Sequence, residues 1–192
     1  MKNKEKGVIL IEILIVFGIL ISIFSITFVS FKKIEEKKEL EEAVIKISEI
    51  IDEYTLRSLS TGIIYKIDLD YIDKKIKIRK LSGDQIEESI NLPKKLTYLV
   101  PYTINGSPRL IEQLTITTTL NGNLSDSFTT YIFDYSEKIK YRIATYNFQE
   151  NKILKINIYK KISGDSISKE ELLKYHELLF SVEELNNDWR KQ

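Results

Sequence analysis

The sequence contains no cysteine and only one histidine, His176, in 192 residues. The absence of thiols excludes disulfides, thiolate metal sites and a cysteine nucleophile. One histidine cannot build a histidine-rich metal site, and it leaves a histidine-based triad with a single candidate base. The sequence also has no P-loop, GxGxxG, HExxH or nucleophile-elbow motif. It therefore predicts no enzyme, no cofactor, no metal site and no small-molecule substrate.

An excess of charge is missing as well, because 29 lysines and arginines face 28 aspartates and glutamates, for a net charge of +1. Nucleic-acid binding normally depends on a clear positive excess. No nucleic-acid partner is expected. The length suits one domain with an appendage.

Residues 8–31 form a long apolar run, VILIEILIVFGILISIFSITFVSF, in which Glu12 is the only ionisable side chain. As a helix the run would cover about 36 Å, more than the ~30 Å hydrocarbon core of a bilayer. A secretory signal has a shorter apolar region followed by a small-residue cleavage site, and neither is found here. The sequence therefore predicts a single-pass transmembrane helix, with its short cationic N-terminus cytoplasmic and the remaining chain extracytoplasmic.

Glu12 is the unusual feature of this run, since a carboxylate near the bilayer interior costs roughly 2.5–3.5 kcal/mol. Either it lies shallow and reaches the interface or stays protonated, or it has a buried cationic partner. The residues around it favour the second interpretation. The segment KGVILIE, residues 6–12, resembles the leader junction of type IV prepilins and type II secretion pseudopilins.

That resemblance implies a specific set of roles. Residues 1–7 would be the leader, prepilin peptidase would cut between Gly7 and Val8, and Val8 would become the mature N-terminus and the site of N-methylation. Glu12 would form the assembly salt bridge with the new amine of a neighbouring subunit. Val8 replaces the commoner phenylalanine, and no proline precedes Pro93. The absence of proline, with Gly18 as the only helix-weakening residue in the apolar run, is more typical of a minor pilin or pseudopilin than of a major pilin.

By the same resemblance, the chain is expected to be a structural subunit of a type IV pilus, a type II secretion pseudopilus or a competence pseudopilus. Its partners would be other pilin or pseudopilin subunits, prepilin peptidase and the inner membrane. The alternative is a signal-anchored extracytoplasmic sensor or scaffold domain, which has no need of a carboxylate in its anchor.

Residues 32–61 are expected to continue the helix in amphipathic form, because no glycine or proline occurs before Gly62. An apolar stripe recurs at spacings of three and four residues. We expect it to pack on the protein's own sheet, with an intermolecular coiled coil as the alternative. The stripe consists of Leu40, Val44, Ile47, Ile51, Tyr54 and Ser58.

Residues 62–165 change to the two-residue period of strands and are expected to form an antiparallel β head of six to eight strands in one sheet. Residues 63–70 and 76–79 predict a hairpin around Asp73 and Lys74. The stretch 116–160 resembles the sheet of the subunit-H-like minor pseudopilins. Further strands are expected at 95–103, 110–120, 128–135, 139–148 and 153–160.

Residues 166–192 predict a C-terminal helix that begins with a capping box of Ser168 and Glu171. The helix would cover a sheet edge or dock another subunit. His176 is expected on a surface turn, in a packing or solvent-facing role. A calcium site is the less favoured use of the oxygens of Asp165, Ser166, Glu170 and Glu171. The apolar face comprises Leu172, Leu178, Leu179, Val182, Leu185 and Trp189.

Together these patterns predict an α+β fold. A long N-terminal helix, transmembrane in its first half and amphipathic in its second, packs on an antiparallel β-sheet head that ends in a C-terminal helix.

Overall fold

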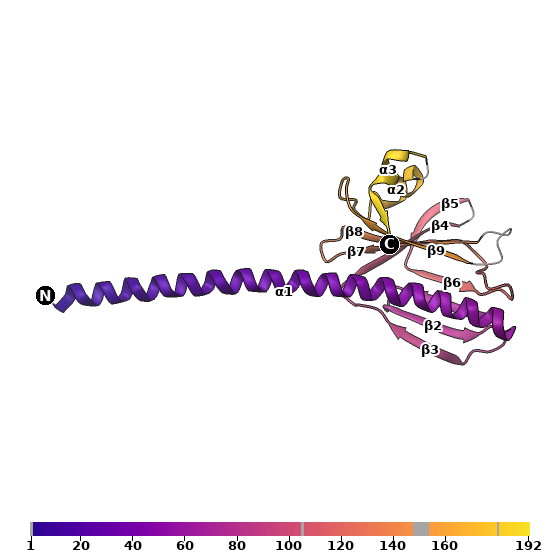
Figure 1. The fold of residues 1–192 in the computed structure, drawn as a ribbon, viewed down its shortest axis with the longest axis horizontal. Coiled ribbons are helices and arrows are strands. Elements are labelled where there is room, and N and C mark those ends of the chain that lie inside the picture. The colour runs from indigo at the N-terminus through magenta and orange to yellow at the C-terminus, as the bar shows by residue number, and fades with distance from the viewer. Residues whose placement is uncertain (1, 105, 148–153, 180) are drawn as a thin grey trace. The chain divides into compact units, whose positions relative to one another are not determined.

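A computed structural model of the protein describes the backbone of residues 2–104, 106–147, 154–179 and 181–192, and the side chains of these residues from 13 onward except residue 26. The chain divides into two compact units, Met1–Lys38 and Glu39–Gln192. The second unit contains all the strands found in the described residues, together with the C-terminal segment (Figure 1).

Helix α1, Lys2–Thr61, accounts for the first unit and continues into the second. It ends where the sequence predicted. Gly62 has a φ of 70° and donates its N–H to the carbonyl of Ser58 at 2.9 Å. Such a left-handed residue at a helix C-terminus is the conformation that glycine adopts without steric cost.

One sheet of the head has four antiparallel strands in the order β3-β2-β1-β6. Ile67 pairs with Ile78 on one side and with Ile116 on the other, so apolar side chains from three strands share one face. The predicted hairpin is confirmed, with Lys74 at a φ of 54° in its turn. The strands are β1 Tyr65–Asp70, β2 Lys75–Lys80, β3 Ile86–Asn91 and β6 Gln113–Thr117.

The other sheet has six antiparallel strands in the order β10-β9-β8-β7-β4-β5. Its strands are β4 Thr97–Ile104, β5 Ser107–Ile111, β7 Thr129–Phe133, β8 Ile139–Tyr146, β9 Lys155–Lys161 and β10 Trp189–Lys191.

The prediction of a single sheet is wrong, because the expected strand 110–120 changes sheets at Glu112. Its first residues end β5 in the six-stranded sheet, and its next residues form β6 in the four-stranded sheet. The Glu112 carbonyl accepts the N–H of Tyr71 at 2.8 Å. Because Glu112 alone separates β5 from β6, the alternation of residues along the chain does not reveal the change of sheet. Strand β3 was not predicted, since its largely exposed residues give little apolar alternation.

The predicted stripe of helix α1 is buried at all six positions. It belongs to one hydrophobic core with inward residues of both sheets, among them Ile67, Ile78 and Ile143. This confirms packing on the protein's own sheets within the second unit. A second core lies on the other face of the six-stranded sheet, where Tyr131 and Phe133 meet Leu172 and Trp189 of the C-terminal segment. That sheet is therefore covered on both faces, and all five residues of β7 are buried.

The C-terminal helix is confirmed as α2, Leu172–Leu179, but the prediction that it extends over 166–192 is wrong. A short helix α3, Glu183–Asn187, and strand β10 follow it. Trp189 leaves the helical pattern because β10 pairs with β9, whose edge would otherwise expose unpaired backbone groups. The expected covering of a sheet edge is thus confirmed.

The capping-box residues do interact, but one turn ahead of the helix that they were expected to cap. The Glu171 carboxylate accepts both the backbone N–H and the hydroxyl of Ser168 at 3.3 Å. Helix α2 begins only at Leu172, after this turn. Local hydrogen bonding of this kind competes with helix formation.

Candidate functional site

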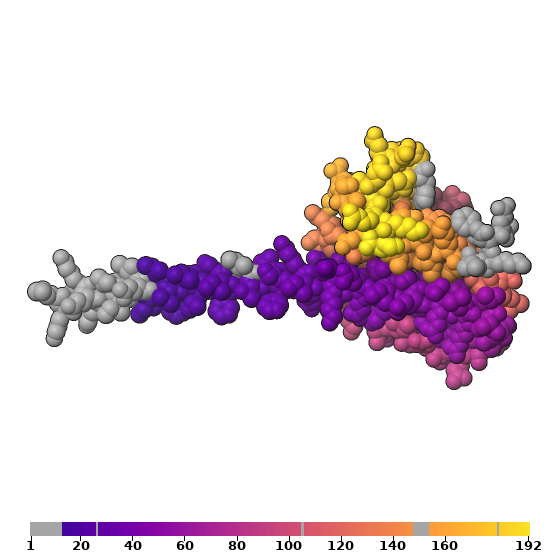
Figure 2. All heavy atoms as spheres, viewed as in Figure 1, coloured from indigo at the N-terminus to yellow at the C-terminus, as the bar shows by residue number. Residues whose placement is uncertain are grey.

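The described side chains of helix α1 in the first unit, drawn in indigo in Figure 2, are almost all exposed. Large apolar side chains described within residues 13–31 have exposed fractions from 44% at Leu20 to 72% at Phe24. None of the most apolar part of this segment is buried. By length and composition this helix can cross a membrane. Soluble surfaces rarely leave so much apolar area uncovered, so this segment has the character of a membrane or protein contact.

Three hydroxyl groups within this surface are satisfied by the helix itself. Each donates to the carbonyl oxygen four residues earlier, so none requires water. The three bonds, each of 2.8 Å, join Ser22 to Gly18, Ser25 to Ile21 and Thr27 to Ile23. The polar residues of the run are therefore compatible with apolar surroundings.

The predicted site residues Gly7, Val8 and Glu12 lie in the first turns of helix α1. Their side chains lie outside the part of the chain whose side chains are described. Cleavage after Gly7, methylation of Val8 and the ion pair of Glu12 stay predictions from the sequence.

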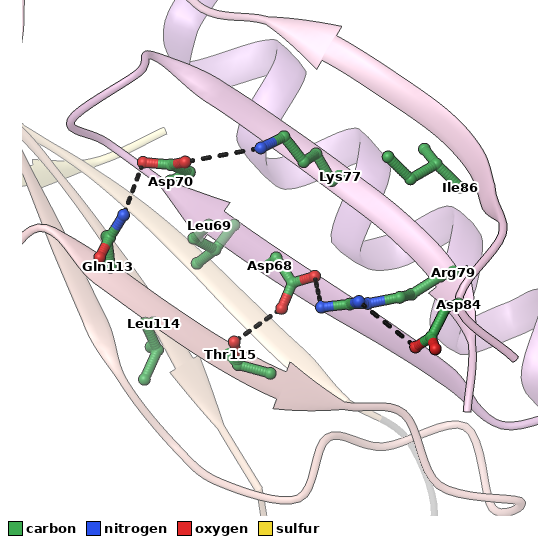
Figure 3. Close-up of a pocket in the computed structure, with 10 residues that line it drawn as sticks. All are labelled: Asp68, Leu69, Asp70, Lys77, Arg79, Asp84, Ile86, Gln113, Leu114 and Thr115. Atoms are coloured by element: carbon green, nitrogen blue, oxygen red, sulfur yellow. Dashed lines mark hydrogen bonds and ion pairs between the residues drawn. The ribbon is translucent and has the colours of Figure 1, made fainter. Parts of the chain in front are cut away.

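A polar groove of about 430 Å³ crosses the four-stranded sheet on the face lined by Asp68, Asp70 and their neighbours (Figure 3). Asp68 lies 2.7 Å from the guanidinium of Arg79 and accepts a hydrogen bond of 2.6 Å from the Thr115 hydroxyl. Asp70 lies 3.7 Å from the ammonium of Lys77. Asp68 and Asp70 of β1 are thus each paired with a cation of the neighbouring strand β2.

Asp70 is held in its ionised form by its hydrogen-bond donors. Burial disfavours the charged form, but hydrogen bonds from the Gln113 amide and the Asp73 backbone N–H outweigh it, so the pKa of Asp70 is lowered. A carboxylate with a lowered pKa makes a poor general base near neutral pH. The groove has the chemistry of a stable sheet surface, whose carboxylates are held by cations and hydrogen-bond donors of neighbouring strands.

The sequence missed the buried arginine beneath the C-terminal segment. Arg142 is 3% exposed and lies between two aromatic rings, 4.2 Å from the centre of Tyr159 and 5.0 Å from that of Trp189. Alternation along β8 places Arg142 on the same face of the strand as Lys140, and two cations at such positions are typical of a solvent-exposed face. Only the folding back of the C-terminal segment buries that face.

His176 lies in helix α2 and is half-buried, so the expected surface turn is wrong. Its Nδ1 lies 2.9 Å from the hydroxyl of Tyr131, which confirms the expected packing role. Burial and, secondarily, the charge of Arg142 lower the pKa of His176 to about 4. The ring is therefore neutral at neutral pH, and it contributes to the packing of the second core.

Acidification is expected to destabilise the head through His176. The unfolded imidazole has a pKa of ~6.5, and the folded one of about 4, so the unfolded state binds more protons between these values. The free energy of unfolding should fall by on the order of 1–2 kcal/mol from about pH 7 to about pH 5. Urea denaturation of the wild type and of His176→Gln measures this loss. The variant should lose less, and an equal loss in both proteins would assign the effect to other groups.

In the described residues no group of three histidine, aspartate or glutamate side chains could hold a metal ion. Of the four residues considered for calcium, Glu171 instead accepts the hydrogen bonds of Ser168.

The long apolar helix, the antiparallel sheets and the C-terminal helix define an α+β protein, the fold class that the sequence predicted. Two solved structures are similar in fold, and both are of the minor pseudopilin EpsH from the type 2 secretion system of Vibrio cholerae. One is 13% identical, with a TM-score of 0.45 over 62% of this chain and 94% of that chain. The other is 15% identical, with a TM-score of 0.42 over 60% and 93%. No protein-family model and no curated protein matches the sequence.

Proposed function

We propose that the chain is a minor pilin or pseudopilin, a structural subunit that is cleaved after Gly7 and assembled through helix α1 into a filament. The machine would be a type IV pilus, a type II secretion pseudopilus or a competence pseudopilus. One observation carries the proposal: the apolar segment of α1 is uncovered throughout its described side chains, and KGVILIE stands at its start.

The physical argument joins the two predicted site residues. Cleavage after Gly7 creates an α-amino group at Val8, at the apolar end of the helix. An amine and a carboxylate in such surroundings each carry a desolvation cost, which their pairing offsets. Glu12 of one subunit would pair with the Val8 amine of its neighbour and so fix the axial register. Methylation of Val8 would keep that amine cationic.

Before assembly, the subunit would stay in the inner membrane with its N-terminus cytoplasmic and its head extracytoplasmic. Prepilin peptidase and other pilin or pseudopilin subunits would be its partners there. The paired charges of the groove and the closed packing of the head support a mechanical role for the head. No reaction is assigned to it.

The signal-anchored sensor or scaffold is the competing function, and the mature N-terminus separates the two. Mass spectrometry of the membrane-bound protein, made with and without an active prepilin peptidase, should show Val8 as the first residue only when the peptidase is active. A bulky residue at the junction, Gly7→Leu, should block the cut. Gly18→Ala is the matched control, because its Cβ would meet nothing within 4 Å, and it should be cleaved normally. Retention of Met1 with an active peptidase would reject the pilin function and favour the anchor.

A further inference from the structure

The C-terminal segment forms an apolar hollow of about 480 Å³ between helices α2 and α3 and the loop after β9. Its floor combines Ile167 and Tyr175, both buried, with the half-buried Leu185. Leu178 also lines it and is 40% exposed. A concave surface of this kind, with aliphatic and aromatic lining, suits an apolar side chain from outside.

The rim of the hollow is acidic. Asp165, Glu171, Glu184 and Asp188 line it, against one cation, Lys174. Asp188 is neutralised by Lys161, whose ammonium lies 3.2 Å away. Among the side chains that the structure describes, Asp165 and Glu184 form no ion pair, and both are exposed. The rim therefore retains a net negative charge.

The hollow is held in shape from beneath. The Trp189 indole donates to the hydroxyl of Tyr175 at 2.8 Å in a buried hydrogen bond. Gly164, with a φ of 76°, comes so close to Asp188 that a Cβ at this position would overlap its carboxylate. A preformed site pays little ordering entropy on binding.

We propose that this hollow docks a segment of a partner polypeptide that presents an aliphatic side chain flanked by lysine or arginine. The floor selects the aliphatic group, and the rim selects the flanking cations. The same negative rim disfavours an anionic lipid surface or a nucleic acid. The proposal goes beyond assembly through helix α1, because it concerns only the head and holds whatever the function of the apolar helix.

Thiol tethering tests the proposal on the full chain in nanodiscs of zwitterionic phosphatidylcholine. Because the chain has no cysteine, Leu178→Cys supplies its only thiol. The probes are two short synthetic peptides of equal length, each with leucines around a single cysteine that is activated as its 2-thiopyridyl disulfide. The protein thiolate attacks the cysteine sulfur and displaces 2-thiopyridone, so the exchange needs no oxidant. One carries lysines at its remaining positions and the other carries glutamates. The lysine peptide should form the disulfide with the Leu178→Cys protein faster by about tenfold or more.

The charge dependence has matched controls in the same chain. Leu81 is exposed on a turn away from the hollow, at 53%, and Leu81→Cys should show no such preference. Adding Asp165→Asn and Glu184→Gln to Leu178→Cys should remove most of it. The emission of Trp189, the single tryptophan, reports whether each variant keeps its fold. Equal rates for both peptides with Leu178→Cys, the same preference with Leu81→Cys, or a preference that survives neutralisation of the rim would overturn the proposal.

Discussion

Glu12→Leu is expected to leave the protein inserted in the membrane and to abolish its assembly. Removing the carboxylate makes the helix more apolar, so insertion should improve by roughly 2.5–3.5 kcal/mol. Assembly should suffer, because the Val8 amine of a neighbouring subunit would be buried without its partner. Breaking a buried ion pair costs about 3–5 kcal/mol, enough to lower filament incorporation more than a hundredfold. Incorporation is measured as the fraction of the protein recovered with sheared filaments or in cross-linked oligomers.

The predicted leader, residues 1–7, supplies a matched control for this experiment. Glu5 carries the same side chain seven residues earlier, and cleavage after Gly7 would remove it. Glu5→Leu should therefore leave incorporation unchanged once the leader has been cut. Normal incorporation of Glu12→Leu would contradict the assembly role of the carboxylate. That result would not bear on cleavage after Gly7, which the mass spectrometry of the mature N-terminus tests separately.

Ile47→Ala is expected to destabilise the head by about 2–5 kcal/mol, the range for emptying a well-packed aliphatic site. Ile47 is fully buried in the core that the α1 stripe forms with both sheets. Such a loss is a large fraction of the stability of a domain of this size. Chemical denaturation of the full chain in detergent micelles, followed by the emission of the buried Trp189, measures the change.

Ile45 is the matched control, because it lies two residues away on the same helix and is 50% exposed. Ile45→Ala removes the same atoms from a surface position, and alanine favours the helix slightly. The expected change is within about 0.5 kcal/mol. Equal destabilisation by the two substitutions would contradict the packing of the stripe on the protein's own sheets.

The features predicted well from the sequence are those with a strong local signal. The stripe from Leu40 to Ser58 repeats with the helical period, and its burial follows from that period. The stop at Gly62 and the turn at Lys74 follow from local backbone preferences.

The features missed depend on contacts between residues far apart in the chain. The switch of sheets at Glu112 leaves the alternation intact, so no pattern along the chain marks it. The position of Trp189 in the sequence is compatible with the apolar face of a helix and with a strand. Trp189 lies in a strand because β10 pairs with the edge of β9. Arg142 is buried by a segment more than thirty residues later in the sequence.

By itself the sequence determined the fold class, the apolar segment and the amphipathic continuation of helix α1. Each follows from the periodicity and composition of a short stretch of sequence, because the side chains of such a stretch lie in the same surroundings. The segment with Gly7, Val8 and Glu12, which resembles a leader junction, gives the functional prediction that the cleavage and assembly experiments address. Tertiary structure decided how the strands divide between two sheets, why the last residues form a strand, and where an acidic rim surrounds an apolar hollow. These features depend on which strand edges and side chains, far apart in the sequence, come into contact. The periodicity of a short stretch of sequence does not indicate those contacts.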